Sequence, residues 1–314
     1  MKLLARAASS ALLLAVIALT GCQKPDQELL RAVGQGRGAV ELAMQRGANI
    51  DARDGAGRTP LSHAAALGDA QVVAYLLKHG AKVDEADNDE ATPLHWAARG
   101  GHGAAIALLL GAHAKVDPVA GLRKRTPLWD AAFSGSADAV NALLQAGADP
   151  NKADTFEQTP LHALALIDSA RAAQIATMLL AGGARPEVRD ARGFTPAHAA
   201  AASDNVGLLR VLVAENAQPV VTATTPSSET PLDIALHYQR DRAAEVLLQA
   251  GATLRAGARP PLHEAARTDS VERAAALLAM GADVTRRFDG RLPLEVARAN
   301  NSQRVEQLLL SRKP

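Results

Sequence analysis

The sequence has few aromatic residues and almost no cysteine. Aromatic side chains make up 3% of the 314 residues, and Cys22 is the only cysteine. A single cysteine cannot form a disulfide within the chain, so the fold depends on packing. With so few large rings, we expect that packing to come from small apolar side chains, mainly alanine, leucine and valine.

The net charge of the chain is also small. Lysine and arginine number 34 and aspartate and glutamate 33, which leaves +1 and gives no general attraction to nucleic acid. The sequence contains no GxSxG or HExxH motif, and no nucleophile, base and orienting residue can be grouped from it. We therefore predict that the chain is not an enzyme. We expect no catalytic residues, no cofactor, no metal site and no nucleic-acid partner. An enzyme with an unrecognised site is the alternative that we rank last.

The N-terminus has the pattern of a targeting segment. Basic Lys2 and Arg6 precede the apolar stretch 11–19, which is too short for a confident membrane span. The tetrapeptide that ends at Cys22, Leu-Thr-Gly-Cys, resembles the lipobox of bacterial lipoproteins. That resemblance implies a signal peptide over residues 1–22 and lipidation of Cys22 with acyl chains such as palmitate. An ordinary signal peptide with an incidental cysteine is the alternative.

The lipobox resemblance also predicts a location. It implies a chain in the bacterial cell envelope that is anchored to the membrane by its lipid and faces the periplasm. Gln23 follows the cysteine, and in lipoproteins a residue other than aspartate there favours the outer membrane. Residues 23–25 are then a short tether, and the remaining residues 26–314 are the folded domain.

That remaining sequence repeats one pattern. In residues 92–117, Thr92 is a natural N-cap, and Pro93 suits the first position of a short helix that Gly101 ends. Ile106 and Leu109 mark the apolar face of a second helix. Two such short helices cannot bury their faces alone, so copies must stack beside them. The matching prolines lie 30 to 36 residues apart, at positions 60, 93, 127, 160, 196, 231, 261 and 293.

This period and the motif TPLHxA, as in residues 92–97, resemble the ankyrin repeat. The resemblance implies an all-α solenoid of about nine helix-turn-helix repeats with hairpin-like loops. Counting back one period places the first, polar repeat at residues 26–58. Three extra residues near 166–171 are expected to lengthen a helix or a turn of the fifth repeat. Four repeats carry glycine 20 residues after the proline (Gly80, Gly147, Gly251 and Gly281), where a residue with positive φ is expected to end the helical pair. His113 and Asn216 hold that place in two repeats.

Two features could be read as metal sites. Four histidines hold the fourth position of the TPLH motif, but equivalent positions in neighbouring repeats are about 10 Å apart, whereas zinc–nitrogen bonds are about 2.0–2.1 Å long. The ankyrin resemblance instead implies that they brace the loops by hydrogen bonds. The acidic run 84–90 could offer oxygen ligands to Ca²⁺, but it fits a solvated loop better. The four histidines are His95, His162, His198 and His263.

The ankyrin resemblance places partner contacts on the concave face, at the loop tips and after the first helix. Exposed aromatic rings and arginines are the residue types that anchor interfaces. Trp96 is assigned to packing, whereas Trp129 either covers the base of its loop or projects from it. The predicted partner-binding residues are Arg99, Arg125, Trp129, Phe133, Phe156, Phe194, His237, Tyr238 and Arg267.

Two functions remain open. The first is a scaffold or regulator that binds an envelope protein through the concave face. The second is an immunity lipoprotein that neutralises a toxin delivered to the periplasm. In both, the partner is a protein of unknown identity, and the membrane is contacted only through the lipid anchor.

Overall fold

The computed structural model describes residues 25–254 and 258–311. The predicted leader 1–22, with its lipidation site Cys22, lies outside these residues, as does all of the tether except Pro25. Within the described ranges, eighteen α-helices form nine consecutive pairs, and the only strand-like pairing is an isolated bridge between Phe288 and Arg291. The predicted all-α ankyrin solenoid is confirmed.

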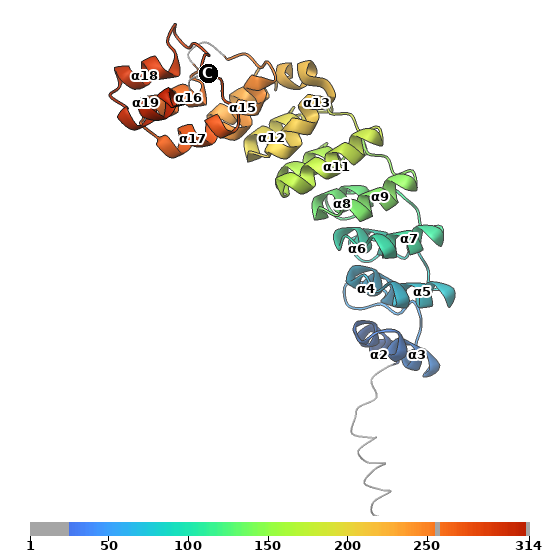
Figure 1. Cartoon of the computed structure of the whole chain (residues 1–314). Coiled ribbons are helices and arrows are strands. Elements are labelled where there is room, and N and C mark those ends of the chain that lie inside the picture. Colours follow the sequence, from blue (N-terminus) through green and yellow to red (C-terminus); the bar gives the residue numbers. More distant parts are fainter. Residues whose placement is uncertain (1–24, 255–257, 312–314) are drawn as a thin grey trace, which may run out of the picture. The chain divides into compact units, whose positions relative to one another are not determined.

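The chain divides into two compact units, 1–122 and 123–314. In the described part of the first unit, three helix pairs stack in chain order (Figure 1). A short 3₁₀ turn, Val33–Gln35, separates the first two helices. The helices are α2 (Pro25–Ala32), α3 (Arg37–Gln45), α4 (Pro60–Leu67), α5 (Ala70–Lys78), α6 (Pro93–Arg99) and α7 (Gly103–Gly111).

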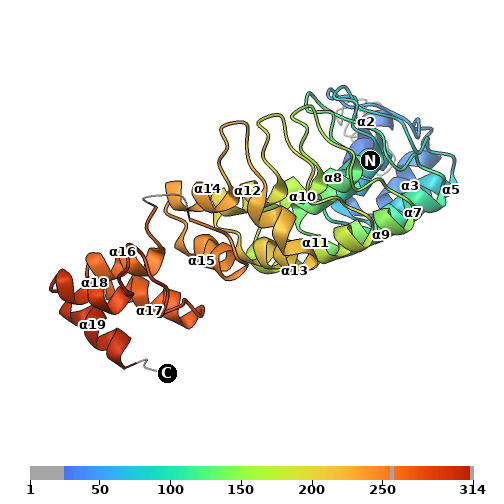
Figure 2. The same ribbon diagram turned by 90° about the horizontal axis from the view of Figure 1, so that it is seen from above.

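The described residues of the second unit contain six further pairs, also in chain order, and the hairpin loops that precede α10, α12 and α14 project to one side of the helices (Figure 2). The pairs are α8 (Pro127–Ser134) with α9 (Ala137–Gln145), α10 (Pro160–Ala163) with α11 (Ser169–Ala181), α12 (Pro196–Ser203) with α13 (Val206–Thr222), α14 (Pro231–His237) with α15 (Asp241–Gln249), α16 (Pro261–Arg267) with α17 (Val271–Ala279), and α18 (Pro293–Ala299) with α19 (Gln303–Leu310).

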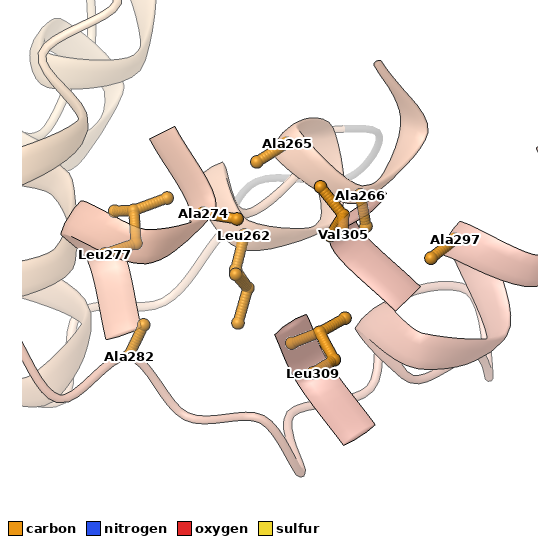
Figure 3. Packing of buried hydrophobic residues seen from close by; sticks show 9 residues of the cluster. All are labelled: Leu262, Ala265, Ala266, Ala274, Leu277, Ala282, Ala297, Val305 and Leu309. Carbon is orange, nitrogen blue, oxygen red and sulfur yellow. The ribbon is translucent and has the colours of Figure 1, made fainter. Parts of the chain in front are cut away.

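Six of the first helices, α4, α6, α8, α10, α12 and α14, begin at the proline of a TP dipeptide. Thr126 has extended backbone, and its hydroxyl accepts a hydrogen bond from the N–H of Trp129, while Pro127 holds the first helical position. The helices then pack through small side chains. In the last two repeats, leucine and valine side chains meet the alanines of facing helices (Figure 3). The labelled cluster is Leu262, Ala265, Ala266, Ala274, Leu277, Ala282, Ala297, Val305 and Leu309.

The fifth repeat absorbs its extra residues in two places. Its first helix is reduced to α10 followed by the 3₁₀ turn Leu164–Leu166, and its second helix α11 is lengthened to 13 residues. The second helix of most other repeats has nine, as α9 has. The expected lengthening of a helix is therefore confirmed. As a consequence, Leu166 stands at the end of a turn with its side chain in solvent.

The sixth repeat departs from the expected hairpin. His113 has the predicted positive φ, but Asn216 has a φ of −157°, so the expectation for Asn216 was wrong. The chain does not turn there into a loop. It kinks and continues as helix to Thr222, which buries Val220 and Val221. The burial of these two valines accounts for the extra helical turn.

Candidate partner-binding face

Histidines of the TPLH motif join neighbouring repeats. The Nδ1 atom of His162 accepts the backbone N–H of Thr159 at 3.2 Å, so the ring proton is on Nε2. Nε2 then donates to the carbonyl oxygen of Phe194, 3.0 Å away in the loop that leads to α12. His198 makes the same pair of contacts, to Thr195 and Glu229. These histidines therefore brace the loops, as the ankyrin resemblance implied.

This arrangement keeps the rings neutral. Burial lowers the pKa of His198 to about 4, and it also lowers the pKa of His162. A proton on Nδ1 would meet a backbone N–H donor and break the contact. Across the described ranges, no group of three His, Cys, Asp or Glu side chains is arranged to hold a metal ion.

Sequence reasoning missed a set of aspartates that shape the loops. The buried carboxylate of Asp190 accepts the backbone N–H groups of Arg192 and Phe194, each at 2.9 Å. Burial alone would raise the pKa of Asp190, but these hydrogen bonds and the Arg192 guanidinium bring it below its ordinary value. The sequence does contain a signal for these aspartates, because each of them lies six residues before a repeat proline. The set is Asp54, Asp87, Asp154 and Asp190.

Arginines lie over phenylalanine rings on two loops of the second unit. The guanidinium carbon of Arg123 is 4.7 Å from the ring centroid of Phe156, and that of Arg192 is 4.6 Å from Phe194. Phe156 remains 49% exposed. The structure thus places both predicted phenylalanines on the loops, where a partner could reach Phe156 directly and Phe194 from one side.

Trp129 is not on the surface. Only 1% of it is exposed, which corrects its assignment as a partner-binding residue and favours the alternative that it covers the base of its loop. The guanidinium carbon of Arg125 lies 3.4 Å from its ring centroid, and Phe133 stacks on it at 5.4 Å. Arg125 is partly buried there, beside the buried carboxylate of Asp154. Of this group, Phe133 offers the most surface, being 45% exposed.

A hollow of about 320 Å³ lies among repeats five to seven. It brings together two predicted residues, Phe194 and Tyr238, with Arg192 and the 70% exposed Leu166. Sequence reasoning missed Leu166, because its exposure depends on how the inserted residues turn. The remaining lining residues are Gln158, His162, Ala165, Ala199, Ala202 and Ser203.

The other predicted residues lie elsewhere. Arg99 is exposed in the first unit, with its guanidinium carbon 5.1 Å from the ring centroid of Trp96. His237 is exposed and packs edge-on against Tyr238. Arg267 is exposed but forms an ion pair with Glu264, which lowers the pKa of that carboxyl to about 2. The structure therefore gathers the predicted set into separate groups.

Comparison with known proteins agrees with this architecture. A family model for ankyrin repeats in three copies matches residues 29–120, 128–223 and 161–258, more than half of the chain. The chain belongs to the ankyrin-repeat family. No curated protein sequence matches it. Ankyrin repeats are protein–protein interaction modules and typically act as non-catalytic scaffolds, so the hollow and the loop phenylalanines are candidate contacts for a protein partner. Among the described residues, no helix has the length and apolar character needed to cross a membrane.

Proposed function

We propose that this ankyrin array is a non-catalytic binding protein whose partner docks in the hollow of repeats five to seven. The observation that carries the proposal is the meeting of Leu166, Phe194, Tyr238 and Arg192 from three separate segments: the turn after α10, the loop before α12 and the end of α14. Leu166 is 70% and Tyr238 51% exposed, and burying such side chains against a partner is favourable. Aromatic residues and arginine are also the types that dominate binding energy at interfaces.

The site is held in shape before any partner arrives. His162 and His198 each join their own helix to the following loop, and Asp190 fixes the loop that carries Arg192 and Phe194. Rigid loops lose little conformational entropy on binding, which favours affinity. The hollow therefore suits recognition of a folded protein surface.

We propose further that the array is tethered in the cell envelope through lipidated Cys22, facing the periplasm, with a scaffold or regulator role toward an envelope protein. The lipobox-like sequence supports this location, and the short tether 23–25 would hold the array near the membrane. The partner would then be at or near the envelope.

The first test is in-cell crosslinking and affinity capture of the full-length chain, with the partner identified by mass spectrometry. We expect one stoichiometric protein partner, lost with Leu166→Ser and with Tyr238→Ala. Leu42→Ser is the matched control, because Leu42 is a similarly exposed apolar residue in the first unit. A resident envelope protein supports the scaffold role. A toxin encoded nearby would replace that role by immunity, and the absence of any protein partner would refute the proposal.

A further inference from the structure

The tips of the loops that precede α8, α10 and α12 in the second unit form one connected strip. The backbone N–H of Thr155 donates to the carbonyl oxygen of Arg123 at 2.8 Å, and that of Ala191 donates to Phe156 at 2.9 Å. Each tip is therefore hydrogen-bonded to the next, and their side chains are held in a fixed order. We call Arg123, Phe156, Arg189 and Arg192 the loop strip. Figure 2 shows that the loops of this region project to one side of the helices.

Exposed charge on this strip is mostly positive. Arg123, Arg189 and Arg192 are exposed, whereas the nearby carboxylates of Asp154 and Asp190 are buried and accept backbone N–H groups. The exposed acids of these loops include Glu157 and Glu187. Arg192 forms an ion pair with the buried carboxylate of Asp190 through Nε and Nη2. Within the described ranges, no acid forms an ion pair with Arg123 or Arg189, so these two guanidinium groups can still pair with an external carboxylate.

The arginines are also fixed in place. Arg123 lies over Phe156, Arg192 lies over Phe194, and the Arg189 guanidinium donates to the carbonyl oxygens of Gly193 and Thr224. A planar guanidinium held in one orientation is suited to bind a carboxylate through two parallel hydrogen bonds. The half-exposed ring of Phe156 beside it offers an apolar contact at the same place.

We infer that the loop strip binds an acidic peptide segment of the protein partner, with its carboxylates on Arg123 and Arg189 and an apolar side chain on Phe156. The inference deepens the proposed function and rests on it. A peptide fits better than nucleic acid, because the net charge of the whole chain is only +1. It also fits better than a membrane surface, because guanidinium groups held in one orientation recognise single carboxylates.

The test is fluorescence anisotropy of the full chain with a labelled peptide of alternating glutamate and phenylalanine. The comparison probe is the same peptide with glutamine in place of glutamate. We expect the glutamate peptide to bind at least about tenfold more tightly, with an affinity that falls as salt is added. Arg123→Gln and Arg189→Gln should each weaken binding by roughly tenfold, the size expected for losing a charged hydrogen bond.

Arg210→Gln is the matched control. It removes the same charge from an exposed position of α13, which Figure 2 shows on the opposite side of the helices from the loops. The inference is overturned if Arg210→Gln weakens binding as much as Arg123→Gln, or if the glutamine peptide binds equally well. It is also overturned if oligothymidylate or anionic phosphatidylglycerol vesicles bind more tightly and lose affinity with the same variants. If the peptide fails while capture still depends on Leu166, the inference falls and the proposed function stands.

Discussion

The Nε2 atom of His198 donates a hydrogen bond to the carbonyl oxygen of Glu229, 3.1 Å away in the loop that leads to α14. On the other side of the ring, Nδ1 accepts the backbone N–H of Thr195, and this second contact requires a neutral imidazole. Protonation must therefore break the contact at the start of α12, whereas the Nε2 contact to Glu229 can remain.

Stability should consequently depend on pH through His198. Its pKa is lowered by burial from 6.5 to about 4 in the folded chain, so between these values the unfolded chain binds more protons. The stabilisation is complete above about pH 6.5 and is lost as the pH falls toward 4, by about 3 kcal/mol in total. Urea unfolding at several pH values measures this loss. The His198→Gln variant should show a smaller dependence, and an imidazole that titrates near its ordinary value by NMR would contradict the prediction.

Pro260 holds the N-cap position that threonine holds before the other TPLH histidines. Proline has neither an N–H nor a hydroxyl to offer, and the buried Nδ1 of His263 has no hydrogen-bond partner within the described residues. Pro260→Thr should therefore stabilise the C-terminal repeats by about 1 kcal/mol, the worth of one net hydrogen bond. Chemical denaturation of the full chain checks this. In the background of His263→Ala the gain should disappear, and an equal gain there would show another cause.

Arg125 and Arg123 make a matched pair for separating structure from binding. Arg125 is partly buried over Trp129, beside the buried carboxylate of Asp154, whereas Arg123 is exposed. Arg125→Ala should cost about 1–3 kcal/mol of unfolding free energy, because it leaves a buried carboxylate without its cation. Arg123→Ala should cost less than about 1 kcal/mol. Thermal and urea unfolding of the two variants decide this, and equal losses would refute it.

Leu109 and Phe156 contrast core with surface. Leu109 is fully buried in α7, so Leu109→Ala should cost about 2–5 kcal/mol. Phe156→Ala should cost under about 1 kcal/mol, because it removes a half-exposed ring and its contact with one arginine. The measurement is the urea midpoint of each variant at neutral pH. A loss for Phe156→Ala as large as that for Leu109→Ala would mean that this ring belongs to the core.

The repeat architecture was predictable from the sequence because its signals are local. Thr92 and Pro93 specify a helix start by their own chemistry, and the fixed spacing of such pairs specifies the stacking. Asn216 was mispredicted because its conformation depends on Val220 and Val221, which become buried when the helix continues.

The site was less predictable because it depends on neighbours from other repeats. Trp129 could have pointed outward, and its burial follows from the positions of Arg125 and Phe133. The exposure of Leu166 follows from the turn that the inserted residues make. The sequence pattern shows neither the packing around Trp129 nor the turn at Leu166. It could therefore predict that Phe156 and Tyr238 are surface residues, but not which side chains lie next to each of them.

The two tryptophans of the chain are divided between its two compact units, Trp96 in the first and Trp129 in the second. Intrinsic fluorescence therefore provides an optical reporter for each half without any attached dye. With Trp96→Phe, emission comes from the shielded ring of Trp129, and with Trp129→Phe it comes from the half-buried ring beside Arg99. The emission of these two variants during refolding would show directly whether one half of the array acts as the template for the other.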